Sequence, residues 1–394
     1  MLWVARILST VAFQVQVVAI GWQIYALTGR ALDLGLIGLS QFVPMVLLTL
    51  VVGQVADRFN RAAVIGICQA IEATAALALA LGVMGEWLGR NGILAIVALI
   101  GSARAFEVPT MAALMPGLVP QSVVHRATAW FASANQSAQI VGPALGGVLY
   151  GLTPVAAYGL AAVLFATAAG LVVAIGTPPH TRAGEPLTLT SIFSGVAFIR
   201  SRPLLFGTLS LDLFAVLFGG ATALLPIYAR DILHTGPWGL GLLRSAPALG
   251  SLTMAVWLAY RPIDRRLGGK LFAAVIVFGA ATFVFGISTN LVLSLGALVV
   301  LGASDVVSVV IRMTLVQLRT PDAMRGRVSA INSLFIGTSN QLGEFESGLT
   351  AALIGVVPSV VMGASATIAI ALLWMYLFPA LRRVHSFIDE VNLM

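Results

Sequence analysis

Twelve long apolar stretches run through this chain, and most of the charged residues lie between them. Of the 394 residues, 59% are hydrophobic and 9% are charged, whereas charged residues make up about 25% of a soluble domain. A bilayer core about 30 Å thick needs a helix of roughly 20 residues, and a buried strand ends after about 4–8 residues. The pattern therefore predicts an all-α membrane protein with twelve transmembrane helices.

The predicted spans fall into two groups of six. Their ranges are 4–27, 33–56, 62–84, 92–113, 126–150, 154–175, 204–229, 238–259, 270–289, 291–314, 328–354 and 358–379. The long gap 176–203 begins with proline-rich turn sequence and continues with helical apolar spacing over 191–200, which predicts an amphipathic helix on the membrane surface. We expect an N-terminal six-helix bundle over 1–175, a cytoplasmic linker over 176–203, and a C-terminal six-helix bundle with a short cytoplasmic tail over 204–394.

The positions of Lys and Arg predict the orientation. With both termini in the cytoplasm, only Arg30, Arg90 and Arg230 fall in outside loops, and most other cations fall in inside loops, as the positive-inside rule requires. The net charge of +7 is therefore a topology signal and no argument for a nucleic-acid partner. Arg6 precedes an apolar run too long for a cleavable signal. We expect a multi-pass monomer embedded in membrane lipids, with both termini in the cytoplasm.

Cofactor chemistry has little support in the residue pattern. The lone Cys68 allows no intrachain disulfide and fits no metal-ligand spacing. The sequence contains no phosphate-binding glycine loop, and its four histidines fall in loops or the tail. We expect no metal site, no cofactor and no ATP hydrolysis by this chain, with a proton gradient as the energy source. A membrane enzyme is disfavoured because no metal cluster or nucleophile–histidine pairing is evident.

The two halves share a sequence repeat. An offset of 201 residues pairs Pro120 with Pro321 and Arg126 with Arg327, in equivalent loops. Parallel halves of this kind are typical of carriers that hold their substrate near the middle of the membrane. The alternative is coincidence in a low-complexity apolar sequence.

The loop after the second span carries a recognisable motif. Its sequence Gly53-Gln-Val-Ala-Asp57-Arg58-Phe-Asn-Arg61 resembles the signature of the major facilitator superfamily. The resemblance implies a cytoplasmic gate, in which Asp57 accepts hydrogen bonds from amides at the start of the eleventh span. The alternative is a charged turn that only fixes topology. The corresponding loop of the second half has Tyr260 in place of the glycine, so an equivalent latch on Asp264 is not expected.

Other segments narrow the resemblance to one branch of the superfamily. Arg104 resembles the family's intramembrane arginine of the fourth span. Gly142, Pro143, Gly146 and Gly147 resemble a fifth-span motif of antiporter-type exporters, although small residues also serve ordinary helix packing. Segments 25–36 and 320–327 resemble the branch of bacterial enterobactin exporters and drug-efflux proteins.

Charged residues inside the spans are the candidate coupling groups. Placing one such charge at the middle of the bilayer costs about 2.5–3.5 kcal/mol. Each charge must therefore be paired with an opposite charge, neutralised, or reached by water in a cavity. Asp305 and Glu107 are the first choices as proton carriers because Asp305 lies 201 residues after Arg104, which shares a helix face with Glu107. Glu344 is the reserve. Further candidates for the cavity are Asp212, Arg312 and Glu346.

Several of these assignments have a plain structural alternative. Each acid can instead serve as a structural ion pair or a buried neutral carboxyl, and Glu72 ranks last because third spans are peripheral in this family. Arg312 lies two turns beyond Asp305 and is a poor direct partner for it. Gln14, Gln16 and Gln23 suggest that a face of the first span borders a polar cavity.

The sequence therefore favours a secondary active transporter that works by alternating access. We expect proton-driven export of a small amphipathic molecule such as a drug, a siderophore or a related metabolite. A carboxyl group removed from water favours its neutral form, which gives proton coupling a physical basis. Uptake or facilitated diffusion of a small solute, and translocation of a lipid or lysolipid, stay open as alternatives.

Overall fold

The computed structural model describes residues 1–115, 118–175 and 189–387, and most of them are helical. Within this part of the chain, 10 helical segments are long and apolar enough to cross a membrane. Two further helices that are more polar, α5 (Val124–Leu152) and α13 (Asp322–Ile354), cover the fifth and eleventh predicted spans. Together these segments match the twelve predicted spans, and the expected all-α membrane fold is confirmed.

The helices form two compact units. One contains the described residues up to 175 together with 225–245, and the other contains 189–224 and 246–387. Residues 225–245 come from the seventh and eighth spans, so the units differ from a simple division at the linker. The bundle boundaries at 175 and 203 stay a prediction.

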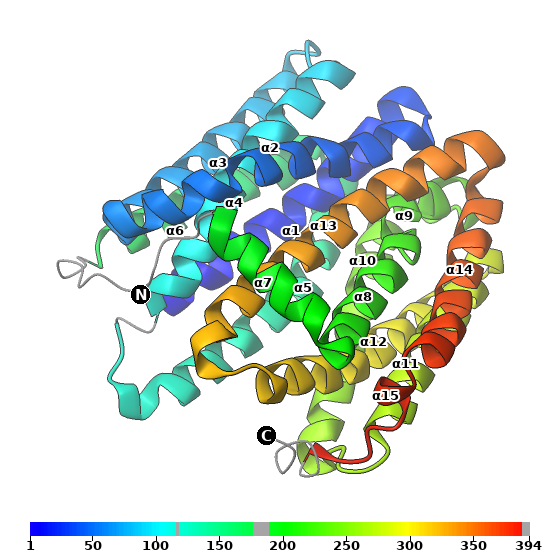
Figure 1. Ribbon diagram of the computed structural model, residues 1–394. Helices are drawn as coiled ribbons and strands as arrows, with labels where there is room; N and C mark the ends of the chain where they lie inside the picture. Colours follow the sequence, from blue (N-terminus) through cyan, green and yellow to red (C-terminus); the bar gives the residue numbers. More distant parts are fainter. Residues whose placement is uncertain (116–117, 176–188, 388–394) are drawn as a thin grey trace. The chain divides into compact units, whose positions relative to one another are not determined.

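The first unit is built mainly from the first six long helices. They are α1 (Leu2–Thr28), α2 (Ala31–Arg58), α3 (Arg61–Met84), α4 (Arg90–Leu114), α5 and α6 (Pro154–Val173). Helix α3 packs against α4 and α6, α1 packs against α5 and α6, and α2 packs against α4 (Figure 1). Local signals set the ends: the Asn60 side chain accepts hydrogen bonds from the first amides of α3, and Gly29 ends α1 with φ 63.

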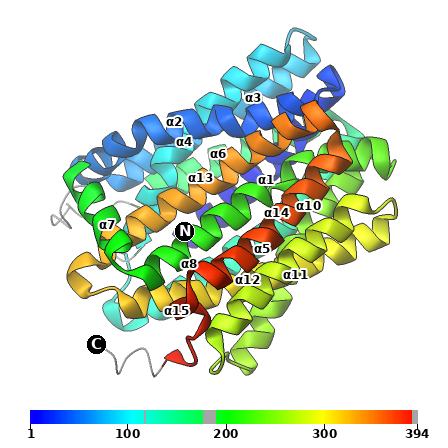
Figure 2. The same cartoon turned by 45° about the vertical axis from the view of Figure 1, so that its right-hand side comes forward.

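The second unit repeats this packing order. Its helices are α7 (Leu189–Ser201), α8 (Pro203–Phe218), the later part of α10 (Gly236–Tyr260), α11 (Leu267–Ile287), α12 (Leu291–Arg319), α13, α14 (Val356–Leu377) and α15 (Pro379–Arg382). Helix α11 packs against α12 and α14, and α8 packs against α13 and α14 (Figure 2). Helix α11 therefore has the same kind of neighbours as α3 in the first unit, and α8 has the same kind as α1. This correspondence is what the sequence repeat predicts.

Two glycines 201 residues apart show the repeat at the level of single contacts. A Cβ atom on Gly101 of α4 would lie 2.8 Å from the Cα atom of Gln41 in α2. A Cβ atom on Gly302 of α12 would lie 2.5 Å from the carbonyl carbon of Pro247 in α10. Real Cβ atoms do not approach this closely, so both crossings need glycine.

The seventh span is interrupted, which the hydropathy pattern did not predict. Helix α8 ends at Phe218, and the chain continues through the 3₁₀ turn η3 (Ala221–Leu224), α9 (Leu225–Ile227) and the π-helical turn η4 (Tyr228–Ile232). Gly219 and Gly220 are weak helix formers in succession, and Pro226 has no amide to donate. These residues explain the break.

Helix α7 lies in the second part of the predicted linker. Its Ile199 packs with Leu205 of α8 and Val328 of α13, and Arg327 Nη1 donates to Ser194 Oγ at 3.3 Å. The position of α7 at a membrane surface stays a prediction. Linker residues 176–188 and tail residues 388–394 lie outside the described residues.

Candidate functional site

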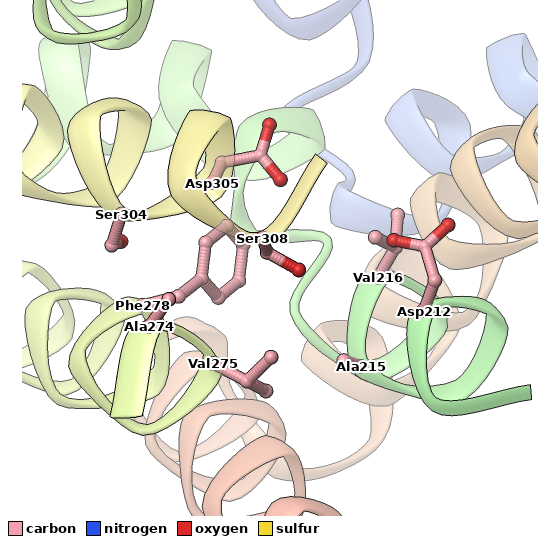
Figure 3. A pocket seen from close by; sticks show the side chains of 9 residues that line it. All are labelled: Asp212, Ala215, Val216, Ala274, Val275, Phe278, Ser304, Asp305 and Ser308. Carbon is pink, nitrogen blue, oxygen red and sulfur yellow. The ribbon is translucent and has the colours of Figure 1, made fainter. Parts of the chain in front are cut away.

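A pocket in the second unit brings together two of the predicted acids. Asp212 of α8 and Asp305 of α12 line it together with Ser304, Ser308 and apolar residues of α8 and α11 (Figure 3). Its volume is about 290 Å³, including the part open to solvent. Because that volume includes space open to solvent, the enclosed part suits water or a single group of a larger ligand.

Asp212 has a cation of its own. Arg312 Nη1 of α12 forms an ion pair with Asp212 Oδ1, and the two side chains are only 4% and 10% exposed. Burial of either charge alone would be costly, and the pair removes most of that cost. The sequence singled out both residues but did not pair them, because they lie on different helices 100 positions apart.

Asp305 differs from Asp212 in its charged surroundings. Its half-buried carboxyl group borders the pocket and makes no ion pair within the described residues. Ser304 beside it donates its hydroxyl to the Leu301 carbonyl oxygen at 2.8 Å. Asp305 therefore presents a carboxyl group to the pocket that a proton or a cationic group can neutralise.

A second charged cluster lies inside the first unit. Arg104 Nη1 is 3.6 Å from Glu107 Oε2 on the same helix and 3.5 Å from Glu72 Oε1 on α3. The Arg104 guanidinium also lies 3.6 Å from the centre of the Phe13 ring of α1. Gln69 Nε2 donates to Glu107 Oε1 at 2.9 Å. The cluster thus joins α1, α3 and α4.

Glu72 ranked last among the acids in the sequence analysis, and the structure places it beside Arg104. Its side chain is fully buried and belongs to the same cluster as Glu107. The sequence carried one usable signal: Gln69 and Glu72 are polar residues three positions apart, hence on one face of an otherwise apolar helix.

The two acids of the eleventh span do not line the pocket of Figure 3. Glu346 accepts a hydrogen bond from Thr350 Oγ1 at 2.8 Å, one turn along α13. Glu344 is half-buried and has an interaction partner. The two glutamates lie about 200° apart around the helix, so they face different surroundings.

The glutamines of α1 have different neighbours, and a shared polar cavity along them stays a prediction. Gln14 lies at α5, where a Cβ atom on Gly142 would be 2.6 Å from the Gln14 Cβ atom. Gln23 is buried and accepts a hydrogen bond from the Tyr158 hydroxyl of α6. Gln16, seven positions before Gln23, is also buried.

The glycine motif of α5 makes close helix crossings. A Cβ atom on Gly146 would lie 2.9 Å from the Val15 Cα atom of α1, and one on Gly147 would lie 2.9 Å from the Gly241 Cα atom of α10. Ser245 Oγ of α10 donates to the Ile140 carbonyl oxygen at 2.6 Å. Pro143 lies within this helix, and its carbonyl oxygen faces Gly241.

Another contact joins α1 to η4 in the same unit. The Tyr25 hydroxyl donates to Asp231 Oδ2, and Arg230 Nη1 donates to the Tyr25 carbonyl oxygen at 3.3 Å. The sequence analysis named Tyr25 only as part of segment 25–36 and Arg230 only as an outside-loop cation, and it did not bring these residues together with Asp231.

The loop motif is described only in part. Arg58 ends α2, and Arg61 at the start of α3 donates to the Ala113 carbonyl oxygen at 2.8 Å. The side-chain environments of Gly53 and Asp57 lie outside what the structure describes.

No group of His, Cys, Asp or Glu among the described residues could hold a metal ion.

Comparison with known proteins agrees with this architecture. The model of the Major Facilitator Superfamily matches residues 2–344. The enterobactin exporter EntS of Citrobacter koseri is 27% identical over 399 residues, covering 97% of this chain and 92% of the relative. EntS of Escherichia coli is 26% identical over 408 residues, covering 99% and 94%.

Solved structures share the fold at low sequence identity. The nucleoside transporter NupG, as its D323A mutant, gives a TM-score of 0.73 at 16% identity, covering 96% of this chain and 98% of its own. A bacterial homologue of the iron transporter ferroportin gives 0.71 at 16% identity, covering 97% and 98%. The repeated helix packing, the full-length relatives and the family match lead to one conclusion: the chain belongs to the Major Facilitator Superfamily and is a secondary transporter that needs no cofactor.

Proposed function

We propose that the chain exports a small amphipathic molecule in exchange for protons, with a siderophore such as enterobactin as the first substrate to test. The observation that carries the proton-coupled part is Asp305. It places a carboxyl group on a membrane-crossing helix, at a pocket, without an ion pair among the described residues.

The physical argument concerns access to water. A carboxyl group favours its neutral form when it is shielded from water and its charged form when water or a cation reaches it. Alternating access would expose Asp305 to each side of the membrane in turn. Because its nearest intramembrane arginine on α12 is held by Asp212, a proton is the simplest partner for the Asp305 carboxylate.

The proposal of export has separate support. The full-length relatives are named as enterobactin exporters, and the motif from Gly142 to Gly147 resembles that of antiporter-type exporters. We further propose a monomer in the bacterial inner membrane, with both termini in the cytoplasm, bundles divided at 176–203, and a cytoplasmic gate formed by Gly53, Asp57, Arg58 and Arg61.

The test is a transport assay in inverted membrane vesicles. Enterobactin, a panel of amphipathic drugs and a lysolipid would each be offered with a proton gradient, and again after an uncoupler. We expect gradient-dependent accumulation of enterobactin or a chemically related substrate. Accumulation that is unaffected by the uncoupler, or transport of the lysolipid alone, would overturn the proposal.

A further inference from the structure

The cluster around Arg104 contains more acid than base. Glu72 and Glu107 are fully buried, and both lie beside the single guanidinium of Arg104. If both acids were ionised, the cluster would hold an uncompensated negative charge inside the membrane, where such a charge is strongly disfavoured.

Among the described residues, no second cation forms an ion pair with either acid. Arg6 of α1 forms no ion pair with either acid among the described residues, and its Nη2 atom donates to Asn135 Oδ1 of α5 at 3.5 Å. Helix α6, which packs against α3, carries no charged residue. Asp33 of α2 is already paired with Arg90, and the other titratable group facing the cluster is the Cys68 thiol.

Hydrogen bonding points to how the charge is balanced. Glu72 Oε2 and Glu107 Oε2 are buried and have no hydrogen-bond partner. The Arg104 Nη1 atom lies 3.5 Å from Glu72 Oε1 and 3.6 Å from Glu107 Oε2, so the two carboxyl groups flank the same nitrogen. One proton placed between them gives an oxygen of each group a partner, and leaves one negative charge opposite Arg104.

We propose that Glu72 and Glu107 share a single proton under the charge of Arg104, so that this cluster is a proton-binding site within the first unit. The Arg104 side chain is 21% exposed, whereas the acids are buried. Withdrawal of the arginine toward water would leave the acids without a cation, and a second proton from water would then bind. Its return would release that proton to water.

The use of this site in transport rests on the proposed proton-driven export, but the shared proton can be tested without any substrate. Infrared difference spectra of the purified chain in lipid vesicles, recorded in H₂O and D₂O, report the carbonyl stretch of a protonated carboxyl group. The variants are Glu72→Gln and Glu107→Gln, each in an Asp305→Asn background that removes the pocket acid without an ion pair among the described residues. Glu86→Gln, in the exposed connection between α3 and α4, is the control.

Sharing makes a specific prediction. Either glutamine variant leaves one carboxylate for one guanidinium, so the band from the cluster should vanish in both variants and persist in the control. A band that vanishes in only one variant would show an isolated neutral acid and overturn the proposal, as would its absence from the parent protein. Because glutamine is nearly isosteric with glutamate, thermal unfolding of each variant checks that the fold survives.

The transport outcome is read separately. If the band behaves as expected but the parent protein shows no proton-dependent export, the proton site stands and the proposed function fails. If export is proton-dependent but the band survives both substitutions, the proposed function stands and this site fails.

Discussion

Arg312 of α12 is bound to Asp212 of α8, although Asp305 lies two helical turns away on the same helix as the arginine. This pairing gives two acids of one pocket different properties: Asp212 has a permanent counter-ion, and Asp305 makes no ion pair within the described residues. Position 104, the repeat equivalent of position 305, is an arginine that binds acids of its own unit. The two halves thus carry opposite charges at matching positions of α4 and α12.

Replacing Asp305 should separate coupling from transport. Asp305→Asn keeps the size of the side chain but cannot exchange a proton, so proton-driven accumulation of substrate should be abolished while downhill exchange continues. Both modes would be measured in the same reconstituted vesicles. Ser308→Ala, which alters the same pocket without removing a titratable group, is the control and should retain accumulation.

An Asp305→Asn protein that still concentrates substrate against its gradient would exclude Asp305 as the coupling acid. The same pair of assays on Glu107→Gln and Glu344→Gln would then show whether another of the candidate acids carries the proton.

Breaking the Asp212–Arg312 pair should destabilise the second unit. Arg312→Met leaves Asp212 as a nearly buried, unpaired charge, which costs about 3–5 kcal/mol in comparable cases. The double variant Arg312→Met with Asp212→Leu removes both charges and should recover most of that loss. Unfolding free energies measured by detergent denaturation would test this, and a double variant no more stable than the single one would contradict it.

Most of the fold followed from helix length and hydropathy, because a bilayer demands about 20 apolar residues per crossing. The pattern did not reveal the interruption at Gly219 and Gly220, since apolar residues continue on both sides of it. The ion pair of Asp212 with Arg312 and the burial of Glu72 depend on which helices become neighbours. Spacing along a chain relates residues on one helix, such as Arg104 and Glu107, but not residues on different helices.

The predicted orientation can be tested by labelling single cysteines. The chain has one cysteine, Cys68, so a Cys68→Ser background leaves only the introduced site. Trp87→Cys, in the exposed connection between α3 and α4, should react with an impermeant thiol reagent in intact cells. Arg382→Cys, exposed near the C-terminus, should react only after the membrane is permeabilised. The reverse result would invert the assigned topology.

The gate motif predicts a charge requirement at Asp57. Asp57→Asn preserves shape but removes the negative charge that helix amides favour, so transport should fall strongly while the amount of protein in the membrane is unchanged. Asp264→Asn, at the degraded second-half equivalent, should have little effect. Equal transport by the two variants would leave this loop as a topology element only.

The crossing of α5 and α10 provides a steric test of the exporter-like motif. A Cβ atom at Gly147 would lie 2.5 Å from the Pro237 carbonyl oxygen, whereas one at Gly151, a turn further along α5, would meet nothing within 4 Å. Overpacking costs about 1–3 kcal/mol, equivalent to a shift of roughly 5–150-fold in the equilibrium between packed and separated helices. Gly147→Val should therefore impair transport, and Gly151→Val should not.

Cross-linking reports the same crossing without a substrate. Ser245 Oγ lies 2.6 Å from the Ile140 carbonyl oxygen, so cysteines at these two positions, in the Cys68→Ser background, should be joined by a short bifunctional thiol reagent. Gly147→Val should reduce that yield because it separates α5 from α10, whereas Gly151→Val should leave it unchanged. If Gly147→Val lowered transport but not the yield, the motif would act by a route other than this helix contact. If it lowered neither, the close approach would be dispensable for transport.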